Sequence, residues 1–132
     1  DMNVAPYLLS STLEGVLGQR LVRTCCKECK VGYEPDDETL ERIEMTRDQI
    51  GGRPFYFGKG CKTCNGTGYK GRKGVFEYLR MSGPLRELVN NRAPTLIIRE
   101  KARELGMRTM REDGIRSILD GYTTVDEVLR YT

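Results

Sequence analysis

The apolar residues near the start of the chain recur at the spacing of a helix. Those within residues 3–20 are Leu8, Leu9, Leu13, Val16 and Leu17. This period predicts a helix that ends at Gly18. Residues 20–25 then alternate between polar and apolar positions, which predicts a short strand. The apolar face of the helix would pack either on a core upstream of this chain or on the core of the domain itself.

The middle of the chain, residues 30–58, combines a helix with a strand. Asp36 or Asp37 can cap a short helix, because an aspartate accepts hydrogen bonds from the free N–H groups of the first turn. The apolar residues of this helix are Leu40, Ile43 and Met45. A glycine pair at 51–52 interrupts the chain, and the aromatic residues 55–57 predict a strand.

Helix signals dominate the last third of the chain, after a strand predicted for residues 74–81. The predicted helix starts are Ser82 or Pro84, Pro94 or Thr95, Thr109 and Thr124. Thr109 with Glu112, and Thr124 with Glu127, have the spacing of a capping box, in which each side chain bonds the other's backbone N–H. We therefore expect a small helical bundle here.

The cysteines are arranged as two pairs. The five are Cys25, Cys26, Cys29, Cys61 and Cys64. Cys26 and Cys29 form one Cys-x-x-Cys turn, and Cys61 and Cys64 form another. Each turn points two thiolates at one ion, and four sulfurs suit tetrahedral zinc. Because all four ligands are protein groups, the predicted Zn²⁺ is structural rather than catalytic.

Other interpretations of the cysteines stay open. Cys25 can replace Cys26, but we prefer Cys26 because the spacing then matches in both pairs, which leaves Cys25 as a small apolar residue. Four-thiolate sites also accept iron. Redox-active pairs occur in thioredoxin-like folds, which carry one pair in a βαβ unit. An odd cysteine count without a secretory signal argues against a disulfide framework.

The predicted fold class is α+β, with a zinc-stapled lobe followed by the helical bundle. The lobe has short strands and one helix. We expect three parts: a helix and strand at 1–24, a tetracysteine subdomain at 25–81, and a helical subdomain at 82–132.

The composition excludes several functions. The absence of His excludes Ser-His-Asp and Cys-His catalytic centres. No phosphate-binding glycine motif is present, so we expect no self-contained nucleotide site. No apolar run approaches the roughly 20 residues of a membrane span. The net charge of +3 is too balanced to indicate nucleic acid by itself. The start without Met, in mid-pattern, indicates a fragment of a longer chain.

A basic segment, residues 58–74, supports an alternative function. Its cations are Lys59, Lys62, Lys70, Arg72 and Lys73. Together with nearby aromatic residues they are compatible with a zinc-ribbon nucleic-acid-binding module. Charged loops around zinc turns are most often simply solvated, so we expect no nucleic-acid partner. Residues 61–68 also match the repeat of the J-type chaperone zinc domain, but that domain needs four copies.

Four segments, taken in order, resemble a known family. They are QRLVRTCCKECKVGY (19–33), GCKTCNGTGYKGRKGVFEYL (60–79), GMRTMREDGIRSILDG (106–121) and TTVDEVLRYT (123–132). The chain resembles the C-terminal part of the bacterial type II secretion ATPases and type IV pilus assembly ATPases. Members usually have an apolar residue in place of Cys25 and Pro in place of Lys27, and neither departure removes a ligand.

The resemblance implies a cytoplasmic protein, peripheral at the bacterial inner membrane. Members form homo-hexameric rings whose ATP-driven movement acts on an inner-membrane platform protein in protein export or pilus assembly. The matched zinc ligands are Cys26, Cys29, Cys61 and Cys64. The family's ATP and Mg²⁺ sites lie upstream, so residues 1–24 become the tail of the ATPase core. The segment itself is then a non-catalytic zinc-binding module, acting in subunit packing and in transmission of movement.

Overall fold

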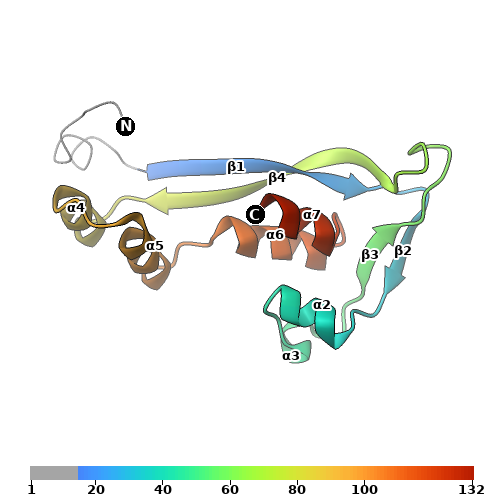
Figure 1. The fold of residues 1–132 in the computed structure, drawn as a ribbon, viewed down its shortest axis with the longest axis horizontal. Helices are drawn as coiled ribbons and strands as arrows, with labels where there is room; N and C mark the ends of the chain where they lie inside the picture. Colours follow the sequence, from blue (N-terminus) through green and yellow to red (C-terminus); the bar gives the residue numbers. More distant parts are fainter. Residues whose placement is uncertain (1–14) are drawn as a thin grey trace. The chain divides into compact units, whose positions relative to one another are not determined.

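The computed structural model describes residues 15–132, which form an α+β structure (Figure 1). The strands are β1 (Gly15–Cys25), β2 (Lys30–Tyr33), β3 (Phe55–Gly58) and β4 (Tyr69–Arg80). The helices are α2 (Asp37–Arg42), α3 (Arg47–Ile50), α4 (Gly83–Asn90), α5 (Thr95–Glu104), α6 (Met110–Leu119) and α7 (Val125–Tyr131). The expected fold class is confirmed. Each helix within residues 15–132 is too short or too polar for a membrane span.

The described residues divide into two compact units, each assembled from separate stretches of the chain. Residues 19–76 and 110–132 form the cysteine unit, which contains all five cysteines. Residues 15–18 and 77–109 form the α4–α5 unit. The C-terminal helices therefore form two packed pairs, α4 with α5 and α6 with α7, each inside its own unit. The division at 1–24, 25–81 and 82–132 stays a prediction.

The helix expected for residues 3–20 is wrong over residues 15–20, which belong to β1. This strand pairs with β4 in a two-stranded sheet. Glycines and β-branched residues, which weaken helices, are frequent in its sequence GVLGQRLVRTC, and pairing supplies partners for the backbone of an extended chain. Residues 3–14 of that expectation lie outside the described residues.

The cysteine unit is built on one apolar core. The buried members are Leu40, Ile43, Ile50, Phe55, Ile118, Val125 and Val128. They come from the segment around α2 and α3, from β3, and from α6 and α7. Phe55 is completely buried in this core. It opens β3, which pairs antiparallel with β2 so that Phe55 faces Tyr33 and Gly58 faces Lys30. The core thus holds the β2–β3 hairpin in place.

Caps define the two short helices of this unit. Asp36 caps α2 by accepting a hydrogen bond from the Thr39 N–H at 2.8 Å, as expected. The sequence interpretation missed α3, where Thr46 and Gln49 form a complete capping box. Gly51 ends α3 with φ 61°, a left-handed conformation that glycine adopts without strain.

The α4–α5 unit has a small core of its own. Met81, Leu85 and Ala102 are its buried members. Pro84 lies in the first turn of α4, as expected, because proline has no N–H to leave unpaired there. On the surface of this unit, Glu77 and Arg99 form a bidentate ion pair with N···O distances of 2.8 and 2.9 Å.

Candidate metal centre

Two turns in the cysteine unit carry the four paired cysteines. Cys26 and Cys29 lie between β1 and β2, and Cys61 and Cys64 lie between β3 and β4. Because Lys30 pairs with Gly58 at the end of the β2–β3 ladder, the two turns continue side by side beyond it. The Lys59 N–H donates to the Cys29 carbonyl at 3.1 Å, which extends the contact toward the cysteines. The hairpin therefore brings together two pairs that are distant in sequence.

The four sulfurs form one cluster. The Sγ atoms of Cys26, Cys29, Cys61 and Cys64 all lie within 4.8 Å of one another. The distances Cys26–Cys61 and Cys29–Cys64 are 3.8 Å, and Cys61–Cys64 is 3.7 Å. A tetrahedron with Zn–S bonds of about 2.3 Å has edges of about 3.8 Å. The donor set and its size therefore fit a four-thiolate metal site.

Cys25 lies outside this cluster. Its thiol is buried, and its backbone N–H donates to the Tyr122 carbonyl at 2.9 Å. Burial raises the pKa of this thiol, so it stays protonated and behaves as a small apolar group. Of the two neighbouring cysteines, the structure brings Cys26 and not Cys25 to the other three sulfurs.

Backbone N–H groups point at two of the sulfurs. Gly60 donates to Cys29 Sγ at 3.3 Å, while Cys61 and Gly68 donate to Cys64 Sγ at 3.3 and 3.2 Å. Such bonds stabilise a thiolate and orient it toward a shared ion, as second-shell donors do at metal sites. The turns therefore provide the supporting contacts as well as the ligands.

The pKa values of two thiols in the cluster are shifted in opposite directions. Burial raises the pKa of Cys29 to about 12, and the neighbouring sulfurs contribute to this rise. Burial also raises the pKa of Cys64, but hydrogen bonds from the N–H groups of Cys61 and Gly68, together with those from the Cys61 and Cys29 thiols, outweigh it and lower the value to about 6. A metal ion bound here would have to displace protons, because cysteine binds metals as the thiolate.

Gly68 is a supporting residue that the sequence interpretation missed. Its N–H bonds Cys64 Sγ, and its carbonyl accepts from the Cys26 N–H at 2.9 Å, so it links both cysteine turns. Its φ is +81°, and a Cβ there would lie 2.4 Å from the Gly58 carbonyl oxygen. A Cβ on Gly66, which follows Cys64 more closely, would meet nothing within 4 Å. The sequence feature that could have indicated this role is the position of Gly68 as the second glycine of the C-x-x-C-x-G-x-G motif at residues 61–68.

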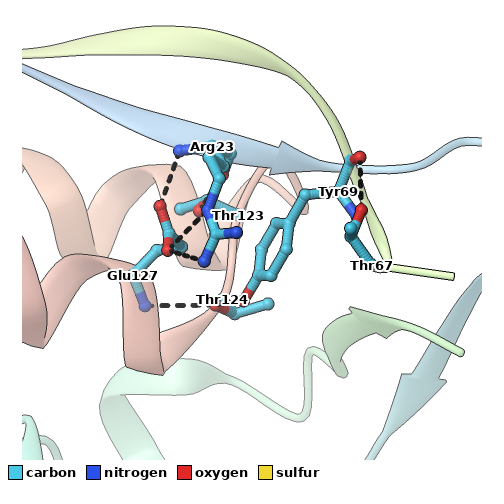
Figure 2. A network of polar contacts seen from close by, with 6 residues as sticks. All are labelled: Arg23, Thr67, Tyr69, Thr123, Thr124 and Glu127. Carbon is cyan, nitrogen blue, oxygen red and sulfur yellow. Dashed lines mark hydrogen bonds and ion pairs between the residues drawn. The ribbon is translucent and has the colours of Figure 1, made fainter. Parts of the chain in front are cut away.

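A polar network joins the second cysteine turn to α7 and β1 (Figure 2). The Thr67 hydroxyl bonds the Cys64 carbonyl at 2.7 Å and also bonds the backbone of Tyr69. The Tyr69 hydroxyl then bonds the Thr124 hydroxyl at 2.8 Å. Thr124 caps α7 by accepting from the Glu127 N–H at 3.2 Å. A continuous series of hydrogen bonds thus leads from the cluster to the last helix.

Glu127 is the buried end of this network, with an exposed fraction of 1%. Its carboxylate accepts from the backbone N–H of Arg23 at 2.7 Å and from the Arg23 guanidinium at 2.7 and 3.0 Å. The guanidinium lies 4.1 Å from the ring centroid of Tyr69. The capping box expected at Thr124 and Glu127 is therefore only half formed, because the Glu127 side chain bonds β1 instead of its own helix start.

Sequence comparisons with known proteins indicate the family of the chain. A sequence profile described as "Type II/IV secretion system protein" matches residues 1–130. The chain is 45% identical over 132 residues to the type IV pilus assembly ATPase PilB of Thermus thermophilus, and covers 15% of that protein. It is 38% identical over 136 residues to the type II secretion system ATPase E of Vibrio cholerae, and covers 26% of it. Each of these alignments includes 100% of the chain.

Proposed function

Because this chain belongs to the type II/IV secretion system protein family, we propose that it is the zinc-binding module of a secretion or pilus assembly ATPase. The module has no catalytic step of its own. It packs against other parts of the subunit ring and transmits ATP-driven movement to inner-membrane partners. The chain spans 15% and 26% of two relatives named as ATPases, so ATP and Mg²⁺ are assigned to the rest of the full-length protein.

The sulfur cluster is the observation that carries this proposal. Cys26, Cys29, Cys61 and Cys64 offer four soft donors at the spacing of a zinc tetrahedron, with N–H groups directed at two of them. Thiolate ligands select zinc or iron over hard cations such as Mg²⁺. Structural zinc supplies folding free energy when it closes such a set.

A stiff connection from the metal to neighbouring elements supports the mechanical role. A bound ion would hold the two cysteine turns together, and the hydrogen bonds through Thr67 and Tyr69 continue to α7. Glu127 then fixes α7 to β1 through three hydrogen bonds from Arg23. The network is anchored at the buried Thr124 and Glu127, and hydrogen-bonded polar networks make the segments that they join more rigid. The module is thereby suited to pass on movement without bending.

The proposal is tested by metal content and by assembly in cells. Purified protein should contain about one zinc per chain. In the full-length protein, Cys64→Ser should remove the zinc and abolish pilus assembly or secretion, while the nucleotide site stays chemically complete. Cys25→Ala is the matched control, because Cys25 is buried one residue from a ligand but lies outside the cluster. It should keep both zinc and function.

Two results would contradict the proposal. Protein with four reduced thiols and no bound metal would end the metal assignment. Normal assembly by a zinc-free Cys64→Ser variant would show that the metal is dispensable for transmission of movement.

A further inference from the structure

An open groove lies beside the first cysteine turn, entirely within the cysteine unit. Its volume is about 780 Å³. The end of β1, the turn that contains Cys26, the start of β4 and the turn after α6 provide its walls. The groove borders the sulfur cluster at Cys26, and the proposed function assigns it no role.

Positive charge that has no ion-pair partner among the described residues is the main property of the groove. Its cations are Lys27, Lys30, Lys70, Arg72 and Lys73. Within residues 15–132, none of the five forms an ion pair, whereas Arg23, Arg42, Arg47 and Arg99 each pair with a carboxylate. Instead, the ammonium groups of Lys30 and Lys73 lie 4.4 and 5.1 Å from the ring centroids of Tyr56 and Tyr122.

Negative charge nearby offsets these cations only in part. Glu28 and Asp120 also line the groove. A zinc ion with four thiolates would add a net charge of about −2 at the end where Cys26 lies. Because the cysteines are largely buried, water screens that negative charge only weakly. The sulfurs lie at one wall of the groove, however, whereas Arg72 and Lys73 belong to another wall, which β4 forms. The open part of the groove therefore attracts anions.

The composition of the lining indicates which kind of anion fits. A nucleic acid presents a continuous row of phosphates, which the carboxylates of Glu28 and Asp120 would repel. A protein segment can place acidic side chains against the cations and donors against these two carboxylates. Tyr122, with 51% of its surface exposed, offers an aromatic ring of the kind that anchors protein interfaces.

We propose that this groove binds an acidic segment of a partner protein. The inference deepens the proposed function, since it gives the chemistry of a contact through which the module would engage its machine. Residues 34–38 (EPDDE), an acidic segment of this chain, are less suited as the occupant in a second copy. Arg47 pairs with Glu34 and Asp37, and Asp36 caps α2, so these acids already have partners inside one copy.

The experiment compares two lysine pairs from the same basic segment. In zinc-loaded full-length protein, Lys70→Gln with Lys73→Gln removes two charges from the groove. Lys59→Gln with Lys62→Gln removes two charges that lie outside its lining. The probe is a fluorescein-labelled peptide of glutamate, aspartate and interspersed tyrosine, followed by fluorescence anisotropy. The groove variant should bind about fivefold more weakly or worse, and the control should stay within about twofold of the unaltered protein.

Several outcomes would overturn the inference. Equal losses in both variants would indicate general electrostatic attraction. A larger effect on single-stranded DNA or on phosphatidylglycerol vesicles than on the peptide would assign the groove to phosphates. Loss of self-association, without any peptide binding, would assign it to a second copy. Zinc content, measured for every variant, distinguishes these results from a failure of the proposed metal site.

Discussion

At the scale of single residues, two glycines after Cys64 have nearly the same φ angle and different surroundings. Gly66 and Gly68 have φ values of +78° and +81°. A Cβ on Gly66 would meet nothing within 4 Å, whereas one on Gly68 would collide with the backbone of Gly58. Backbone contacts cannot move aside as a flexible side chain does. The close approach, more than the dihedral angle, therefore determines which glycine supports the candidate metal site.

This contrast predicts the effects of two alanine substitutions. Gly66→Ala should cost about 1–2 kcal/mol of stability from the left-handed conformation alone. Gly68→Ala should also displace the N–H that bonds Cys64 Sγ, and so weaken zinc binding by about 10–100-fold. Chelator competition measures both affinities. Similar zinc affinities in the two variants would show that contact between Gly58 and Gly68 does not support the site.

The adjacent acids of α7 give a second prediction at this scale. Asp126 and Glu127 each pair with an arginine, but Asp126 is exposed, whereas Glu127 is buried. Glu127→Gln should lower the opening free energy of α7 by about 2 kcal/mol, because the charge is removed and one of the two oxygens that accept from Arg23 becomes an NH2 group, which cannot accept. Asp126→Asn should cost less than about 1 kcal/mol. Hydrogen exchange of the α7 amides measures both, and equal effects would contradict the importance of burial.

At the scale of elements, the packing of α6 on α7 depends on one helical glycine. A Cβ on the buried Gly114 would lie 2.7 Å from Cγ1 of Val128. Valine is stiff at χ1, and Val128 is completely buried, so it has little freedom to retreat. The glycine therefore lets two helices approach closely, although it weakens α6 itself.

Two opposing effects decide whether Gly114→Ala raises or lowers the stability of the folded protein. Alanine adds about 1 kcal/mol of helix propensity, while overpacking a core costs about 1–3 kcal/mol. We expect net destabilisation in thermal unfolding, and partial rescue by Val128→Ala, which makes room for the added methyl group. If Gly114→Ala alone raises the melting temperature, the contact is looser than the distances indicate.

Sequence patterns correctly predicted the helices and strands that depend on nearby residues. They failed where pairing with a distant segment determines the conformation of the chain. Asp36, Pro84 and the aromatic residues of β3 act within a few positions, and α2, α4 and β3 appear where expected. Residues 15–20 have an apolar spacing that also suits a helix, but pairing with β4, more than 40 residues later, makes them a strand. The missed α3 is different, since its Thr46–Gln49 capping box was visible in the sequence.

The same limit applied to the candidate metal centre: local spacing predicted its ligands, but not the contacts that support them. The spacing of Cys26, Cys29, Cys61 and Cys64 indicated one cluster, because two equal turns offer equal geometry. The supporting role of Gly68 and the bonding of Glu127 to Arg23 depend on approaches between distant segments. Glu127 has the local spacing of a capping residue, and only the position of β1 shows that its carboxylate is used elsewhere.

At the scale of the whole molecule, the cysteine cluster, α6 and α7 belong to one compact unit, while α4 and α5 belong to the other. Structural zinc supplies on the order of 10 kcal/mol, which is comparable to the stability of a small domain. Removing the metal should therefore affect residues near both ends of the described chain.

Metal removal gives a prediction that follows this division. Chelation of zinc from the full-length protein should accelerate hydrogen exchange throughout 19–76 and 110–132. Exchange in α4 and α5 should change much less, because these helices pack on their own core. Mass spectrometry of peptic fragments resolves the two sets. Retained protection of α6 and α7 after chelation would show that they are stable without the metal.

The bond from Arg23 to Glu127 also has a consequence for the order of events during synthesis. These residues are 104 positions apart, whereas Cys26 and Cys61 are 35 apart. Shorter loops close at lower entropic cost. A nascent chain can therefore gather its cysteines around an ion while its last helix is still inside the ribosome. Glu127 would then form its hydrogen bonds with Arg23 last, after a bound metal had already folded the cysteine turns.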